Sequence, residues 1–357
     1  MNCCANCFKD SELKAMIEGN NIKGTCYFCK SNNEFIFDIT KENYIKNYFA
    51  QLIDIYIPIR KDMKVNIFPS SSNLIDILKN KWNIFNLKQS QIKEFLIEMF
   101  PHRYKSNPAI FDEDVEIVGI NDPMTILDYS LLKNYQWEDF VTEIKYKNRF
   151  HTEIVNKFIL DTFLNATIKE YKAGKKFYRA RLWDSEKGYE IKDMGPPPFQ
   201  KVSGGRANPK GISNLYLSNS ELTTLYEIRS NKYDKISVGT FELIKDIEIV
   251  DLTMIGKISP FQDNMDLRLL AINYDHLKKI EKEISKPHRI HDSELDYLPT
   301  QYICDYINSK KTFSGIQYQS TLYKRGINLA IFNSEEFKCI EVKNIEIDSI
   351  EYSYYKN

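Results

Sequence analysis

The stretch that decides the fold of the second half of the chain reads Gly204-Gly205-Arg206-Ala207-Asn208-Pro209-Lys210-Gly211. It is a glycine-punctuated loop that carries one arginine. A short apolar strand, Leu215 to Leu217, follows it, and Ser220 then caps a helix. Glu227 comes seven residues after that cap, on the same helix face as Ser220. The pattern predicts an arginine on a mobile loop and a carboxylate on a rigid helix.

Composition sets the limits for the whole chain. With 357 residues it is long enough for two or three domains and a sizeable core. Its 49 Lys and Arg balance 49 Asp and Glu, so no net charge attracts it to nucleic acid or to an anionic membrane. We find no apolar run long enough to span a bilayer and no signal-peptide core. We therefore expect a cytoplasmic protein.

Five of the seven cysteines lie within the first 29 residues. Four of them form two Cys-x-x-Cys pairs, Cys4 with Cys7 and Cys26 with Cys29, at a spacing typical of zinc ribbons. Four thiolates fill a tetrahedral shell, so we expect one structural zinc ion. A disulfide pair is the alternative, and a reducing compartment disfavours it. The other cysteines are expected to be spare or core residues: Cys3, Cys304 and Cys339.

The spacing of apolar residues changes once along the chain. Residues 40–172 read mainly as helix, including a long helix at about 148–172. From Gly174 onward, short β-rich runs alternate with helices, which predicts an α+β domain with a mixed or antiparallel sheet. The predicted division is a zinc ribbon at 1–38, a helical domain at 39–172 and the α+β domain at 173–357.

Several short motifs follow one another along residues 172–343. They are Phe177-Tyr178-Arg179-Ala180-Arg181, Gly204-Gly205-Arg206-Ala207-Asn208-Pro209, Leu215-Tyr216-Leu217-Ser218, Glu227 and Tyr318-Gln319-Ser320-Thr321. Two further stretches match longer members: Leu298-Pro299-Thr300-Gln301-Tyr302 and Asn328-Leu329-Ala330-Ile331-Phe332. In order and spacing these motifs resemble the RES domain, a bacterial family named for its Arg, Glu and Ser residues.

The resemblance implies an enzyme that degrades NAD and releases nicotinamide, by phosphorolysis or by hydrolysis. It also implies a fold related to that of ADP-ribosyltransferase toxins. Several members are toxins paired with an antitoxin, so the expected role is a toxin or an anti-phage defence effector. The expected partners are NAD, inorganic phosphate if the reaction is phosphorolysis, and an antitoxin or defence-system protein; a homo-oligomer stays open. The amino-terminal half is similar to the HEPN-like extension of some members.

The same residues suit this chemistry. Breaking the nicotinamide–ribose bond develops positive charge on the ribose, which a fixed carboxylate stabilises, and Glu227 is the candidate. The two charges of the pyrophosphate suit guanidinium groups, so we expect Arg179 and Arg206 to converge on one cleft. Arg181 is the alternative to Arg179, because alternation places both on one face of the strand.

Two more residues complete the predicted site. Tyr216 is expected to stack on the nicotinamide ribose or to bind it by a hydrogen bond, although a core tyrosine would show the same pattern. Ser320 resembles the family serine and is expected to position substrate. It is not expected to act as a nucleophile, because no His–Asp pair accompanies it at a recognisable spacing.

The competing interpretation is a nucleic-acid module, since zinc ribbons often bind DNA or RNA and HEPN domains can be ribonucleases. Ribonucleases of the HEPN class carry an Arg with a His a few residues further on. Here His151 follows Arg149 too closely, and Arg103 has no such His after it. The neutral charge balance also disfavours this interpretation. A third alternative, a binding protein without catalysis, requires the arginines or the carboxylate to be misplaced.

Overall fold

The computed structural model describes residues 1–41, 43–59, 72–184, 187–286 and 293–351. The chain forms two compact units. The first consists of Met1–Asn134 and Ile258–Tyr274, and the second of Tyr135–Lys257 and Asp275–Asn357. Residues 258–274 therefore belong to the first unit although they lie far along the sequence. The division into segments 1–38, 39–172 and 173–357 stays a prediction.

The first unit begins with a small antiparallel sheet that holds the cysteine pairs. Its strand order is β1 (Asn2–Cys4), β3 (Glu34–Asp38), β2 (Lys23–Gly24). Helix α1 (Ser11–Gly19) follows the first pair of cysteines. This helix starts at Asp10 because the aspartate side chain accepts a hydrogen bond from the backbone N–H of Leu13 at 2.9 Å.

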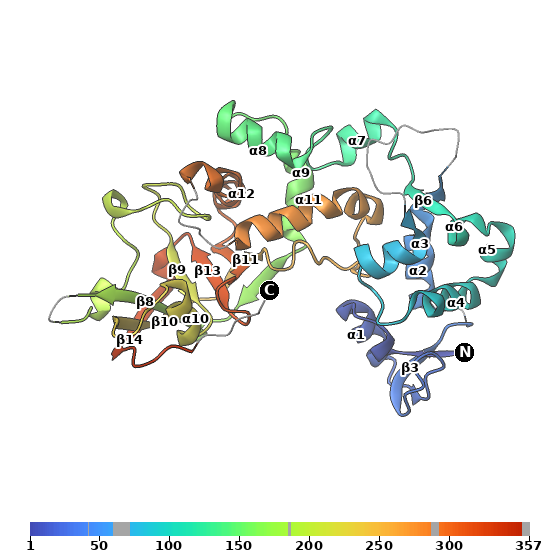
Figure 1. The fold of residues 1–357 in the computed structure, drawn as a ribbon, viewed down its shortest axis with the longest axis horizontal. Coiled ribbons are helices and arrows are strands. Elements are labelled where there is room, and N and C mark those ends of the chain that lie inside the picture. The colour runs from blue at the N-terminus through green and yellow to red at the C-terminus, as the bar shows by residue number, and fades with distance from the viewer. Residues whose placement is uncertain (42, 60–71, 185–186, 287–292, 352–357) are drawn as a thin grey trace. The chain divides into compact units, whose positions relative to one another are not determined.

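The rest of the first unit combines short helices with a second three-stranded sheet (Figure 1). The helices are α2 (Tyr44–Asp54), α3 (Leu74–Asp76), a π-helix (Ile77–Lys81), α4 (Gln89–Met99), α5 (Pro101–Ser106), α6 (Ala109–Asp112) and α7 (Pro123–Tyr129). The strands, in sheet order, are β4 (Tyr56–Pro58), β6 (Asp114–Ile117) and β5 (Ser72–Asn73). Buried phenylalanines form the core; the ring centroids of Phe49 and Phe95 are 5.3 Å apart.

The second unit contains an eight-stranded mixed sheet (Figure 1). Its order is β14 (Phe337–Glu346), β10 (Lys235–Leu243), β8 (Lys176–Trp183), β9 (Leu215–Ser218), β13 (Ile327–Ile331), β12 (Gly315–Gln319), β11 (Ile247–Asp251) and β7 (Ile168–Tyr171). Neighbouring strands are antiparallel except β11 and β12, which are parallel. The sheet confirms the predicted α+β class.

The second unit also contains helices, several of which contact the sheet. They are α8 (Trp137–Tyr146), α9 (Lys157–Asn165), α10 (Glu221–Glu227) and α12 (Leu298–Ser309), while α11 (Leu267–Ser285) has residues in both units. Helix α10 contacts β8 and β9, and α12 contacts β12 and α8. The apolar side chains of one cluster are buried in this unit: Phe177, Leu215, Leu217, Ile249, Leu329 and Ile331. Among the described helices, none is long and apolar enough to cross a membrane.

Two predictions about residues 40–172 have different outcomes. The stretch is mainly helical, as predicted, and it also contributes the β4–β6–β5 sheet. The predicted long helix at 148–172 is wrong, since α9 covers only Lys157–Asn165 and Ile168–Tyr171 forms strand β7. Helix α9 starts late because the Asn156 side chain accepts from the backbone N–H of Ile159. Strand β7 exists because it pairs with β11, a contact that no local pattern can indicate.

Candidate active site

A cavity of about 270 Å³ opens on the sheet of the second unit. Side chains of β8, β9, β12, β13 and α10 line it. Strands β8 and β9 pair at a single position, Tyr178 with Ser218. The strands are therefore not joined along their length, and both of them contribute to the wall of the cavity.

A row of four polar residues crosses the sheet at the cavity. The register aligns Tyr178 with Ser218, Ser218 with Asn328, and Asn328 with Tyr318. Residues directly opposite each other on neighbouring strands place their side chains on the same face. All four line the cavity, so the row forms a polar floor built from four different strands.

Helix α10 supplies the carboxylate. It starts where predicted, because the Ser220 hydroxyl accepts from the backbone N–H of Thr223 at 3.1 Å. Glu227 is the last residue of the helix and lines the cavity. Its Oε1 accepts two hydrogen bonds, from the Ser320 hydroxyl at 2.6 Å and from the Asn328 amide at 2.7 Å. The structure thus brings Glu227 and Ser320 together across 93 residues of sequence.

The Ser320 hydroxyl uses its only proton in the hydrogen bond to this carboxylate. Ser320 Oγ accepts from the backbone N–H of Tyr323 at 3.1 Å and donates to Glu227. The Asn328 side chain is fixed in the same way, because its Oδ1 accepts from the Ser218 hydroxyl at 2.7 Å. Ser320 and Asn328 therefore orient the carboxylate. Such a serine is not arranged as a nucleophile, since no base accepts its proton other than Glu227.

Arg179 supplies positive charge to the cavity. One guanidinium nitrogen, Nη1, donates to the backbone carbonyl of Tyr216 at 3.1 Å, while Nε is buried without a partner. Burial, and secondly the charge of Arg181, lowers the pKa of Arg179 to about 10, so the group stays charged at neutral pH. Arg181 does not line the cavity; it donates to the carbonyl of Gly195 and lies 5.5 Å from the ring centroid of Tyr189.

The structure does not place the Arg206 side chain in the cavity. Its Nε donates to the carbonyl of Lys286 at 2.7 Å and its Nη1 to the carbonyl of Glu283 at 3.4 Å. These carbonyls lie at the carboxyl-terminal end of α11, where a helix leaves its last carbonyls without internal partners. The guanidinium is also 4.9 Å from the ring centroid of Tyr297.

The loop that carries Arg206 nevertheless borders the cavity. The hydroxyl of Tyr216, which lines the cavity, donates to Asn208 of this loop. Gln301 of α12 donates to the carbonyls of Gly205 at 2.7 Å and Asn208 at 3.1 Å. A Cβ atom on Gly205 would lie 3.3 Å from the Tyr216 hydroxyl, which leaves little room for a larger residue. The hydroxyl of Tyr216 is therefore occupied by the loop.

Sequence reasoning missed all four residues of the polar floor: Tyr178, Ser218, Asn328 and Tyr318. All four stand in stretches that carry the resemblance, yet none was given a role. The signal that could have found them is the alignment of neighbouring strands. That alignment needs the strand order, which the sequence does not provide.

Comparison with known proteins identifies the family of this chain. The model of the RES domain matches residues 176–354, half of the chain. The chain belongs to the RES family. It is also similar to the crystal structure of the M. tuberculosis MbcT–MbcA toxin–antitoxin complex, with a TM-score of 0.33 and 12% sequence identity over 53% of this chain and 92% of that chain. No curated protein matches it. The resemblance predicted from Phe177 onward is confirmed.

The four predicted zinc ligands of this RES protein lie together in the first unit. Sγ of Cys4 is 3.7 Å from Sγ of Cys7 and 3.4 Å from Sγ of Cys29, and the Sγ atoms of Cys7 and Cys26 are 3.5 Å apart. All four Sγ atoms lie within 4.8 Å of one another. A tetrahedral zinc with bonds of about 2.3 Å needs sulfur pairs about 3.8 Å apart, so the arrangement fits. The cysteines expected in the core, Cys304 and Cys339, are buried.

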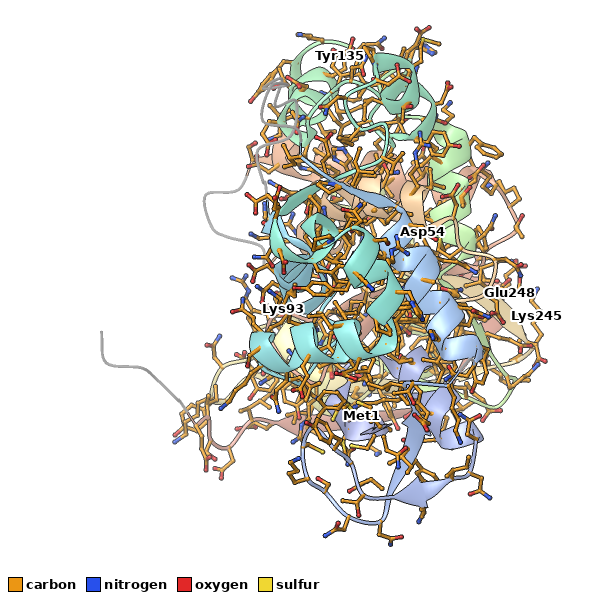
Figure 2. The ribbon with its side chains drawn as sticks, turned by 90° about the vertical axis from the view of Figure 1, so that its right-hand side faces the viewer. Met1, Asp54, Lys93, Tyr135, Lys245 and Glu248 are labelled. Carbon is orange, nitrogen blue, oxygen red and sulfur yellow. The ribbon has the colours of Figure 1, made fainter. Side chains whose placement is uncertain are left out.

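A second cavity, of about 450 Å³, lies at the other end of β12 and β13. Its lining includes Ser314, which precedes β12, and Phe332, which follows β13. Lys245 and Glu248 also line it and lie at the surface in Figure 2. None of the predicted site residues, all of which the structure describes, belongs to this lining. The candidate active site is therefore the smaller cavity.

Proposed function

We propose that this RES protein degrades NAD by cleaving the bond between nicotinamide and ribose. The observation that carries the proposal is the Glu227 carboxylate, which Ser320 and Asn328 hold at 2.6 and 2.7 Å in a cavity that also contains Arg179. An oriented carboxylate and a buried guanidinium suit a substrate that carries phosphates and develops positive charge when its bond breaks.

The proposed reaction starts with departure of nicotinamide. The C1′–N bond of the ribose breaks, and its electron pair goes to the nitrogen of the pyridinium ring, which leaves as a neutral base. Positive charge develops on the ribose, and the negative charge of Glu227 stabilises it. Because Oε1 of Glu227 already accepts two hydrogen bonds, Oε2 is the oxygen for a ribose hydroxyl. The nucleophile then bonds to C1′ and loses a proton to solvent when it is water.

Arg179 is the proposed ligand of an anion, either the pyrophosphate of NAD or an attacking inorganic phosphate. Its buried Nε has no partner in the protein, so binding an acceptor oxygen there removes the cost of an unsatisfied donor. Arg206 remains a proposed pyrophosphate ligand, and in that role it must release the carbonyls of Lys286 and Glu283. Tyr216 is proposed to border the ribose of NAD and to hold the Arg206 loop in place through its hydrogen bond to Asn208.

Release of nicotinamide from NAD by the purified full-length chain tests the proposal. We expect release under saturating NAD, and comparison of phosphate-free buffer with added inorganic phosphate distinguishes the two acceptors. ADP-ribose as the product indicates hydrolysis, and ADP-ribose 1″-phosphate indicates phosphorolysis. Absence of nicotinamide release in both buffers, from protein with a cooperative melting transition, would refute the proposal.

The biological role and the amino-terminal half belong to the same proposal. Removing NAD harms any cell, so the enzyme is proposed to be a toxin or defence effector that an antitoxin or another protein of the same system restrains. The four clustered cysteines are proposed to hold one structural zinc ion, with no open position for chemistry. The HEPN-like assignment of residues 39–172 and the relation to ADP-ribosyltransferase folds are proposed on the resemblance alone.

A further inference from the structure

Tyr318 is one of two tyrosines of the cavity floor, with Tyr178, whose hydroxyls form no hydrogen bond with the residues that the structure describes. It stands on β12 directly opposite Asn328, the residue whose amide binds Glu227. Among the described residues, no side chain or backbone group forms a hydrogen bond with its hydroxyl. The neighbouring hydroxyls of Ser218 and Tyr216 are both occupied, by Asn328 and Asn208. Tyr318 therefore presents a free donor to the cavity.

The surroundings keep this phenol in its neutral, donating form. Burial, followed by the neighbouring Tyr216 and Glu227, raises the pKa of Tyr318 well above its usual value. Tyr318 and Glu227 line the same cavity, and Asn328, which lies directly opposite Tyr318, donates to the carboxylate. A neutral donor beside an acceptor carboxylate is the combination that a sugar hydroxyl needs, because such a hydroxyl donates one hydrogen bond and accepts others.

We propose that Tyr318 is a substrate-binding residue whose hydroxyl donates to a ribose hydroxyl oxygen next to Glu227. This inference rests on the proposed function and assigns the ligand class: a furanose with two adjacent hydroxyls. One sugar hydroxyl donates to the free Oε2 of Glu227, and an oxygen of the diol accepts from Tyr318. Tyr318 and Glu227 thus bind two neighbouring hydroxyls of the sugar ring, and together they set the position of C1′ in the cavity.

The test is the affinity of the full-length chain for ADP-ribose, measured by calorimetry for wild type and for Tyr318→Phe. ADP-ribose carries the ribose next to nicotinamide but no bond to cleave. We expect the variant to bind ADP-ribose about tenfold more weakly, the effect of one lost hydrogen bond. The affinity for ADP, which lacks this ribose, is expected to stay unchanged. Tyr233→Phe, at a tyrosine that is 67% exposed, is the matched control and should bind both ligands like wild type.

The outcomes separate this inference from the proposed function. Equal binding of ADP-ribose by wild type and Tyr318→Phe overturns the role of Tyr318, while nicotinamide release by wild type still supports the enzyme. A similar loss of affinity for ADP places the contact on another part of the ligand and also overturns the assignment. Wild type that binds no ADP-ribose overturns the assignment too. If the Phe variant does not fold, Tyr318→Met removes the same hydroxyl and replaces it.

Discussion

At the scale of single residues, Glu227 carries the proposed chemistry, and Glu227→Gln keeps its size while removing the charge. We expect turnover to fall about a hundredfold, because the charge stabilises the transition state. KM should change only a few-fold, since the positive ribose exists only transiently. The measurement is nicotinamide release under saturating NAD. Glu221→Gln on the same helix, where Glu221 pairs with Lys343 at 2.8 Å, should behave like wild type.

Turnover of Glu227→Gln within a few-fold of wild type would remove both the role of Glu227 and most of the case for this enzyme class. A large loss in Glu221→Gln would instead indicate that any change of charge on α10 disturbs the cavity.

Asn328 is expected to act through Glu227 and not on the substrate. Asn328→Ala frees the carboxylate from one of its two donors, so we expect turnover to fall about tenfold with a smaller change in KM. In a Glu227→Gln background the same substitution should cost little more, because the two residues act as a unit. Asn121→Ala, at an exposed asparagine of the first unit, is the control. Independent, additive losses would contradict a positioning role.

Arg179→Lys tests the anion ligand. A lysine ammonium cannot reproduce the forked contacts of a guanidinium, so KM for NAD should rise about tenfold. Because the pKa of Arg179 is lowered to about 10, the charged form persists from pH 7 to 9, and the affinity of wild type for NAD should fall only as the pH rises through 10. Arg181→Lys should change KM less, since Arg181 binds the Gly195 carbonyl outside the cavity. The reverse ranking would assign the anion to Arg181.

Single residues also mark the limit of what the sequence predicts. Glu227, Ser320 and Arg179 stand in recognisable motifs; the structure brings Glu227 and Arg179 to one cavity and Ser320 into contact with Glu227. The direction of the Arg206 side chain could not be predicted, because it depends on the carbonyls at the end of a helix some 80 residues later. Asn328 and Tyr318 gained their roles from strand register, which non-local pairing decides.

At the scale of elements, the turn between β12 and β13 holds Ser320 against Glu227. The backbone N–H of Ser320 donates to the carbonyl of Gly326 at 2.9 Å, and the rings of Tyr323 and Tyr226 stack with centroids 5.1 Å apart. A Cβ atom on Gly326 would lie 2.6 Å from Cγ2 of Thr223 and 2.9 Å from Cβ of Ser320. Helix α10 and the turn are therefore packed too closely for any side chain at this position.

Gly326→Ala should destabilise the protein by about 1–3 kcal/mol through overpacking, and should lower turnover because Ser320 or α10 must move. Thermal melting and nicotinamide release measure the two effects. Gly19→Ala, where nothing lies within 4 Å of the added atom, should leave both unchanged. A fully active and stable Gly326→Ala variant would show that the turn adapts without moving Ser320.

Elements with local signals were predicted best. Strand β9 and helix α10 were expected because an apolar run followed by a serine cap is readable from neighbouring residues alone. The stretch at 148–172 was read wrongly because its apolar residues also fit a helix. Only the pairing of β7 with β11 turns residues 168–171 into a strand.

At the scale of the whole molecule, we expect one zinc ion per chain and a metal that supports folding without taking part in the reaction. Cys7→Ser should lose the ion and lower the thermal stability of the first unit, while nicotinamide release stays within a few-fold of wild type. Elemental analysis and thermal melting provide the measurements. Cys3→Ala, outside the four ligands, should retain the ion. Wild type with far less than one zinc, or an inactive Cys7→Ser variant that remains folded, would contradict this expectation.

The path of residues 258–274 has a consequence for how the protein can be divided. These residues lie within the stretch that the RES model matches, yet they belong to the first unit. Phe261 and Leu270 are buried there, and the Phe261 ring lies 5.1 Å from that of Phe49. A protein that lacks the residues before the RES motifs would expose the apolar side chains of this segment, and exposed apolar surface promotes aggregation. The two units thus alternate along the sequence, so no single cut in the chain separates one complete unit from the other.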